Sequence, residues 1–141
     1  MYFDTSYIAK FYFNEPDSPR VREVVRTADI IYSSLWTLAE FHGVLHRQMR
    51  EGVVSTAGAS DLAARFLDHV EAGLWNLIPV NDSLLRMTSA LLVSAPPVLF
   101  LRTADAVHLT TALQIGEREV WTNDRHMLAA AAYFGLTGRS V

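Results

Sequence analysis

Short apolar segments alternate with longer stretches of helical periodicity along the whole chain. The apolar segments predict strands at residues 2–3, 29–32, 75–80 and 119–122, with room for a last short strand in the C-terminal tail. Helical patterns cover residues 6–14, 18–26, 34–51, 55–72, 82–94, 103–114 and 124–134. Strands that alternate with helices are typical of βαβ units on a parallel sheet. The sequence therefore predicts an α/β fold, a helix-rich three-layer α/β/α sandwich with a mainly parallel central sheet.

Local signals mark where several of these helices should begin and end. Ser18, which precedes a proline, Ser34 and Asp82 are expected N-caps, since short polar side chains accept hydrogen bonds from the first free backbone N–H groups. Gly52 and Gly73 are expected to end two helices, because glycine readily adopts the left-handed conformation that often follows a helix.

The chain has 141 residues, 50% of them hydrophobic, and no cysteine. A domain of this length buries roughly 70% of its unfolded surface, so we expect one domain over residues 1–141. The lack of cysteine excludes disulfides, thiolate metal sites and cysteine nucleophiles. No apolar stretch reaches the roughly 20 residues of a membrane span, and the N-terminus lacks a signal-peptide pattern. We therefore expect a soluble, cytoplasmic protein with no membrane partner.

Four acidic residues stand where this pattern ends a strand or runs along a helix: Asp4, Glu40, Asp105 and Asp124. Ligands of parallel sheets bind beyond the carboxyl ends of the strands. Asp4 follows the first strand and Asp124 a later one, and the helices that carry the other two acids could lean over the same edge. The four side chains can therefore converge on one cleft.

Carboxylates that share a cleft repel one another and lose hydration, so they are stable together only with bound cations or raised pKa values. Oxygen ligands of this kind suit Mg²⁺ or Mn²⁺, which points to metal-assisted phosphodiester chemistry. The net charge of −3 neither supports nor excludes RNA binding. If bound cations offset the four acids, the remaining charge is slightly positive, and arginines could pair with phosphates.

Four segments resemble the motifs of the PIN domain, and in particular of the short VapC-type toxins. The residues Asp4-Thr-Ser resemble the family's D-T-S turn, and Glu40 matches its second acid. Residues 103–113 (TADAVHLTTAL) are similar to the third motif and residues 121–128 (WTNDRHML) to the fourth. The resemblance spans essentially the whole chain, in order. The chain departs from the family in a short first strand and in Arg102-Thr103, where more apolar residues would be expected.

The resemblance implies a metal-dependent endoribonuclease that hydrolyses RNA phosphodiester bonds as the toxin of a toxin–antitoxin pair. It also implies a homodimer, inhibited by a small antitoxin whose C-terminal segment covers the cleft. With Mg²⁺ or Mn²⁺ as cofactor, we expect Asp4 and Asp105 to bind the ion directly. Glu40 and Asp124 would complete the catalytic cluster directly or through water.

Several neighbours of the acids could support this site. Thr5, Ser6, Thr122 and Asn123 are candidates to hydrogen-bond the carboxylates from behind. Arg125 could contact the scissile phosphate of RNA, although pairing with an acid is an equal alternative. His108 fits a packed histidine better than a substrate contact.

The same four acids also allow roles other than metal binding. Asp4 and Asp124 could be simple helix N-caps, and Glu40 and Asp105 could lie on solvated helix faces. The chain could be a phosphohydrolase with Asp4 as the nucleophile, although such folds commonly place a second acid where Ser6 stands. It could also be a PIN-like domain without catalysis that acts as a binding module.

Overall fold

The computed structural model describes the whole chain, residues 1–141, and contains five strands and seven helices. The strands are β1 (Tyr2–Phe3), β2 (Tyr32–Ser34), β3 (Asn76–Ile78), β4 (Glu119–Trp121) and β5 (Thr137–Arg139). They form one sheet in the order β3-β2-β1-β4-β5, and all neighbouring strands are parallel. The predicted parallel sheet is confirmed, and the short first strand occupies its centre.

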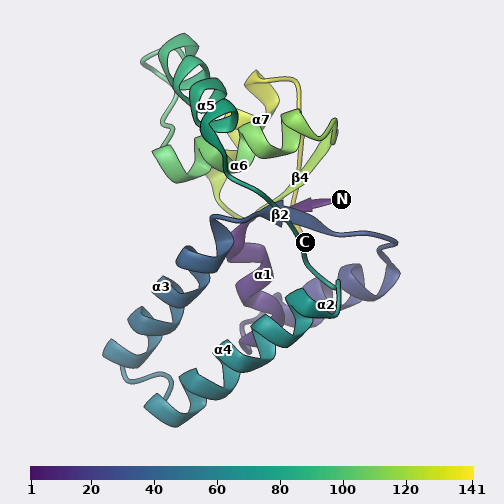
Figure 1. Ribbon diagram of the computed structural model, residues 1–141, viewed down its shortest axis with the longest axis vertical. Coiled ribbons are helices and arrows are strands. Elements are labelled where there is room, and N and C mark those ends of the chain that lie inside the picture. The colour runs from purple at the N-terminus through teal and green to yellow at the C-terminus, as the bar shows by residue number, and fades with distance from the viewer.

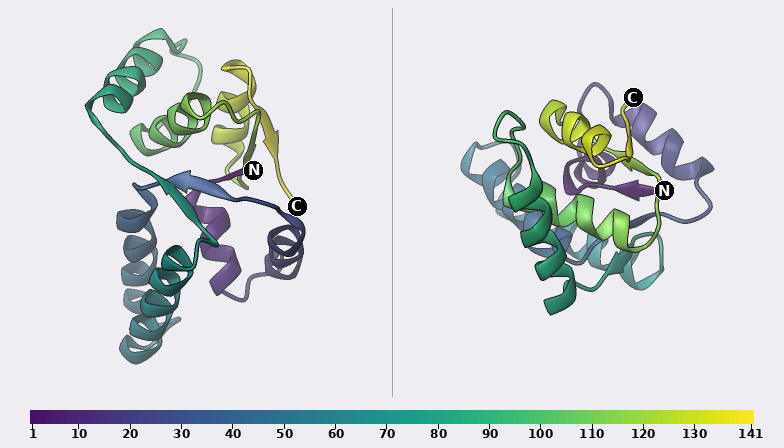
Figure 2. Two further views of the ribbon diagram at one scale, coloured as in Figure 1. Left: turned by 45° about the vertical axis from the view of Figure 1, so that its right-hand side comes forward. Right: turned by 90° about the horizontal axis from the view of Figure 1, so that it is seen from above.

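The helices form two layers, one on each face of the sheet (Figures 1 and 2). One layer holds α1 (Thr5–Tyr12), α2 (Ser18–Thr27), α3 (Thr37–Arg50) and α4 (Thr56–Glu71); the other holds α5 (Asp82–Ser94), α6 (Thr103–Gln114) and α7 (Arg125–Tyr133). In Figure 1, α3 and α4 form a hairpin that extends away from the sheet. The predicted three-layer α/β/α sandwich is confirmed. No helix has the length and apolar character needed to cross a membrane.

Each layer buries its own apolar core. Between the sheet and α1–α4, the rings of Phe41 and Phe66 stack with centroids 4.2 Å apart. In the same core, the indole Nε1 of Trp75 donates a hydrogen bond of 2.7 Å to the hydroxyl of Tyr12. This bond satisfies a polar group that burial would otherwise leave unpaired. The smaller core under α6 and α7 centres on side chains such as Leu109.

The helix ends confirm some local signals and correct others. Gly52 and Gly73 follow α3 and α4 with φ of 71° and 77°, as predicted. The N-cap of α2 is Asp17 and not Ser18. The hydroxyl of Ser18 instead accepts a hydrogen bond from the N–H of Glu15. The serine thus stabilises the turn that leads into the helix.

Two further starts lie away from their expected residues. The second strand begins at Tyr32, and α3 begins at Thr37, because Ser34 is the last residue of β2 and its hydroxyl accepts from the N–H of Trp36 in a turn. The N-cap of α5 is Asn81, whose side chain accepts from the N–H of Leu84 at 2.9 Å, so Asp82 is the first helical residue. A serine or aspartate can serve a turn or a cap equally well, and the sequence pattern alone does not separate the two.

Candidate active site

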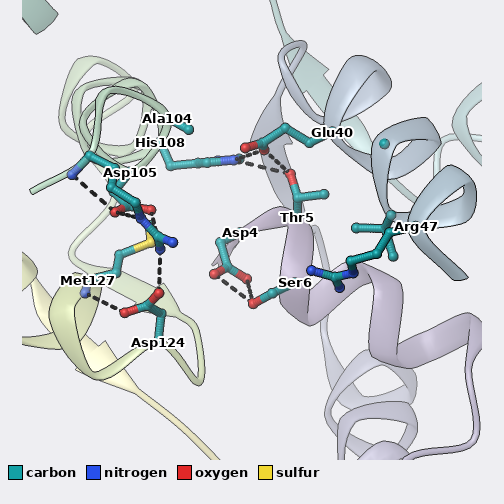
Figure 3. A pocket seen from close by; sticks show the side chains of 13 residues that line it. Asp4, Thr5, Ser6, Glu40, Arg47, Ala104, Asp105, His108, Asp124 and Met127 are labelled. Carbon is teal, nitrogen blue, oxygen red and sulfur yellow. Dashed lines mark hydrogen bonds and ion pairs between the residues drawn. The ribbon is translucent and has the colours of Figure 1, made fainter. Parts of the chain in front are cut away.

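A cleft of about 390 Å³ lies beyond the carboxyl ends of the central strands, and all four predicted acids line it (Figure 3). Asp4 joins β1 to α1, Glu40 lies in the first turn of α3, Asp105 lies in the first turn of α6, and Asp124 is the N-cap of α7. The other lining residues are Thr5, Ser6, Gly43, Val44, Arg47, Arg102, Ala104, His108 and Met127. Four separated segments therefore converge at one edge of the sheet, as the sequence predicted.

Asp4 lies at the floor of this cleft and is buried. The parallel pairing of Phe3 with Trp121 brings the residues that follow the two strands together, so the Thr122 hydroxyl donates to the Asp4 carboxylate at 2.6 Å. The hydroxyl of Ser6 and the N–H of Tyr7 also donate to it. Burial raises the pKa of Asp4, and these hydrogen bonds offset only part of that effect. None of the donors carries a charge.

Glu40 faces the same cleft and is held by buried polar groups. Its Oε2 accepts from the Thr5 hydroxyl at 2.5 Å and lies 2.8 Å from Nε2 of His108. Burial would raise the pKa of Glu40, but the hydrogen bond and charge interaction with His108, the hydrogen bond from Thr5 and the charge of Arg102 outweigh this effect, so the pKa lies below its ordinary value. Glu40 is therefore an anion at neutral pH.

The remaining two acids share one arginine. Arg102 donates to Asp105 from Nε at 2.8 Å and from Nη2 at 3.2 Å, and the same Nη2 contacts Asp124. Asp124 also caps α7 by accepting from the N–H groups of His126 and Met127. Burial would raise the pKa of Asp124. The two N–H groups and Arg102 lower it by more than burial raises it, so the pKa lies below its ordinary value.

The donor set of the cleft fits a divalent cation that prefers oxygen ligands. Asp4 is a buried carboxylate with only neutral donors, which is the environment that a nearby cation relieves most. In the arrangement seen, however, no three acidic or histidine side chains form a group that could hold one ion together. Arg102 already supplies a positive charge to two of the acids. Shared coordination by Asp105 and Asp124 therefore requires Arg102 to move.

The predicted supporting residues divide into three that meet an acid and one that does not. Thr5 donates to Glu40, whereas Ser6 and Thr122 donate to Asp4. The prediction for Asn123 is wrong. Its amide nitrogen donates to Asp17 at 3.1 Å and its oxygen accepts from the hydroxyl of Ser140, so its side chain bonds to none of the four acids.

Two of the acids are helix caps as well as cleft residues, so the helix-cap alternative does not exclude a site in the cleft. Asp4 and Asp124 do cap α1 and α7, and both carboxylates still line the cleft. The solvated-face alternative does not hold for Asp105, which is buried.

The arginines that line the cleft are not the one predicted from the sequence. Arg125 does not line the cleft, and its Nε faces Nε2 of its neighbour His126 at 3.4 Å. Arg102 and Arg47 line it instead, and Figure 3 shows the guanidinium of Arg47 directed toward the side where Asp4 and Ser6 lie. Arg47 makes no ion pair with an acid of the chain, which leaves its guanidinium available to an anion.

His108 is buried as expected, but it is also part of the cleft lining. The signal for this role was its position three residues after Asp105, one turn along the same helical face.

Two sequence comparisons agree with this arrangement. The family described as "PIN domain" matches residues 1–133. A protein named "Ribonuclease VapC46", from Mycobacterium tuberculosis, is 30% identical over 138 residues, which covers 96% of this chain and 93% of that protein.

Solved structures share the fold at lower identity. VapC20 from M. tuberculosis, described as a toxin that cleaves the sarcin-ricin loop, has a TM-score of 0.73 at 18% identity and covers 92% of this chain and 93% of its own. FitAcB from Neisseria gonorrhoeae has a TM-score of 0.69 at 17% identity, with 97% and 94% covered. A toxin–antitoxin complex from Klebsiella pneumoniae has a TM-score of 0.60 at 18% identity, with 91% and 89% covered.

Proposed function

Since the chain belongs to the PIN domain family, we propose that it is an endoribonuclease that hydrolyses RNA phosphodiester bonds as the toxin of a toxin–antitoxin pair. The observation that carries this proposal is the convergence of Asp4, Glu40, Asp105 and Asp124 on one cleft. The 30% identical relative is itself named a ribonuclease. An enzyme that acts on cellular RNA would work in the cytoplasm.

The four carboxylates would hold Mg²⁺ or Mn²⁺, with Asp4 and Asp105 as direct ligands and the other two completing the site. A bound divalent ion supplies Lewis acidity, a lowered pKa for attacking water and compensation of the charge that builds at phosphorus. The chain's own part is to keep the acids ionised and oriented. Thr122 and Ser6 hold Asp4, and Thr5 holds Glu40.

The RNA backbone would meet the two arginines of the cleft. Arg47 on α3 and Arg102 before α6 both line the cleft. Guanidinium groups match phosphate oxygens in charge and geometry, so Arg47 can bind a phosphate directly. Arg102 can do the same once it is released from the acids.

We propose two protein partners. A small antitoxin would cover the cleft with a basic segment, since arginine pairs well with clustered carboxylates; one of the similar structures is itself a toxin–antitoxin complex. A second copy of the chain would form a homodimer. An apolar groove of about 430 Å³ beside α5, lined by Met87, Leu91 and Leu113 among others, gives that copy a surface to cover. Light scattering of the purified chain measures the dimer directly.

The test is cleavage of RNA by the purified protein with Mg²⁺, with Mn²⁺ and with a chelator. We expect internal cleavage that needs the ion and is lost in Asp4→Asn and Asp105→Asn. Asp61→Asn, an exposed acid on α4, is the matched control and should cleave normally. Unchanged cleavage by the Asp4 and Asp105 variants would refute the proposal. Growth arrest on expression, relieved by a small neighbouring gene product, would support the toxin role.

The same preparation separates the alternatives. A phosphohydrolase with Asp4 as the nucleophile would form a phosphoryl or beryllofluoride adduct on Asp4. A binding module without catalysis would bind no divalent ion in calorimetry and would leave RNA intact. The four intact carboxylates in one cleft favour the ribonuclease over the binding module.

A further inference from the structure

A buried histidine links the centre of the sheet to Glu40. His108 on α6 is 3% exposed and stands between two partners that are remote in sequence. Its Nδ1 lies 2.9 Å from the hydroxyl of Tyr2 on β1, and its Nε2 lies 2.8 Å from Oε2 of Glu40 on α3. The rings of Tyr2 and His108 meet edge to face, at 74° and 5.9 Å between centroids. Three elements are therefore joined through one imidazole.

We propose that His108 is a positioning residue that holds Glu40 ready in the cleft, and that the hydroxyl of Tyr2 holds the imidazole ring in place from its other side. This inference rests on the proposed function only in taking Glu40 as a residue of the ribonuclease site. The hydrogen-bond arrangement itself is a property of the folded chain.

The orientation of the ring follows from its two polar contacts. Tyr2 is fully buried, and its hydroxyl lies at hydrogen-bond distance from Nδ1, which fixes one side of the imidazole. On the other side, Nε2 meets the carboxylate of Glu40 and lies 3.2 Å from the hydroxyl of Thr5. A buried ring held at both nitrogens cannot turn away from Glu40 without leaving a polar atom unpaired.

A second set of donors supports the same carboxylate oxygen. The Thr5 hydroxyl donates to Oε2 of Glu40 and lies 3.1 Å from the hydroxyl of Thr37. Thr37 in turn meets Ser33 at 2.8 Å, and Ser33 donates to the carbonyl of Phe3. The chain of hydroxyls anchors the carboxylate to the backbone of β1 and β2. Oε2 thus has two donors, whereas Oε1 has no protein donor and remains for a ligand.

Holding Glu40 in this way has a chemical purpose. A glutamate side chain loses rotamer freedom when it is fixed, and the fold fixes this one before any ligand binds. The carboxylate is therefore already oriented when a cation arrives.

Three variants test the assignment. His108→Gln keeps an N–H donor at similar reach, His108→Leu keeps the approximate volume without a donor, and Tyr2→Phe removes only the hydroxyl. His46→Gln, an exposed histidine on the same helix as Glu40, is the control. Thermal unfolding first identifies a temperature at which every variant is folded.

The measurement is Mn²⁺ binding by calorimetry, in which His108→Leu should weaken affinity by about 10–100-fold. His108→Gln should restore most of this affinity, Tyr2→Phe should weaken it less than His108→Leu does, and His46→Gln should bind like the parent.

Normal Mn²⁺ affinity in folded His108→Leu would overturn the assignment, as would a parent protein that binds no Mn²⁺. The failure of the proposed function looks different. In that case Mn²⁺ affinity falls in His108→Leu as expected, but the parent protein cleaves no RNA.

Discussion

Arg102 and Asp124, 22 residues apart in the chain, meet at the mouth of the cleft, where Nη2 of the arginine donates to Oδ2 of the aspartate. The same guanidinium is held by Asp105 at 2.8 Å through Nε. A cation bound by these two acids would occupy similar space and satisfy the same charges. Arg102 is thus an internal counter-ion of Asp105 and Asp124.

Replacing Arg102 by Gln should strengthen divalent-ion binding, because the ion no longer has to displace a guanidinium. We expect about a tenfold gain in Mn²⁺ affinity in calorimetry, which corresponds to about 1.4 kcal/mol of released competition. The metal-free variant should lose about 1 kcal/mol of stability to urea, since Asp105 and Asp124 then lack a positive neighbour.

Arg47→Gln is the matched comparison, because Arg47 lines the same cleft without an acid partner. Its Mn²⁺ affinity and metal-free stability should stay unchanged, while binding of a non-cleavable RNA analogue weakens and loses part of its salt dependence. Weaker Mn²⁺ binding in Arg102→Gln would show that the arginine helps the ion rather than competing with it.

The pattern of the sequence was sufficient for the layers of the fold and for the meeting of Asp4 with Asp124, whereas the convergence of Glu40 and Asp105 also depended on how their helices lean over the same edge. Alternating strands and helices imply a parallel sheet, and acids placed after its strands must emerge at one edge. Only the direction of the backbone matters for this edge, so the expected place of the acids does not change although α3 begins three residues later than predicted. The position of Asp4 depends on nothing finer than the end of β1.

Side-chain pairing could not be predicted in the same way. Arg102 stands three residues before Asp105, but its contact with Asp124 exists only because α6 and α7 begin side by side in the fold. His108 has partners 68 and 106 residues away. Asn123 follows Thr122 directly, yet successive side chains at a strand end point to opposite sides, so it meets Asp17 instead of the cleft.

Asp4→Asn should separate activity from stability. The asparagine oxygen can still accept from the N–H of Tyr7, so the cap of α1 survives. Loss of the carboxylate should lower RNA cleavage by about 100-fold or more, beyond the 10–100-fold typical for residues that only support ligands. An Mn²⁺ concentration of about 100 times Kd should stabilise the parent by about 2.7 kcal/mol and the variant by much less. Equal stabilisation of both, measured by thermal unfolding, would remove Asp4 from the ion site.

Without added metal, the pH dependence of the free energy of unfolding should differ between the parent and Asp4→Asn. Burial raises the pKa of Asp4 above 3.8, so its contribution to stability is complete below about pH 3.8 and is lost as the pH rises through the folded-state pKa. Glu40 and Asp124 have lowered pKa values, so their contribution is present above pH 4.5 and is lost as the pH falls toward their folded-state values. Urea unfolding from about pH 3 to 7 should therefore show a growing advantage of Asp4→Asn as the pH rises. A constant difference across that range would contradict the raised pKa.

Two glycines should respond to alanine with opposite signs. A Cβ at Gly138 on β5 would lie 2.7 Å from Cδ2 and 3.3 Å from Cα of Leu128, so the Leu128 side chain would have to turn and the backbone of α7 would have to give by a few tenths of an ångström. Overpacking of this kind costs about 1–3 kcal/mol.

Gly43, inside α3, has nothing within 4 Å of its added Cβ. Alanine there should stabilise the helix by about 0.5–1 kcal/mol, because glycine loses more backbone freedom on folding. Urea unfolding of the two variants in metal-free buffer measures both effects, and a stable Gly138→Ala protein would mean that α7 packs less tightly on β5 than this structure has it.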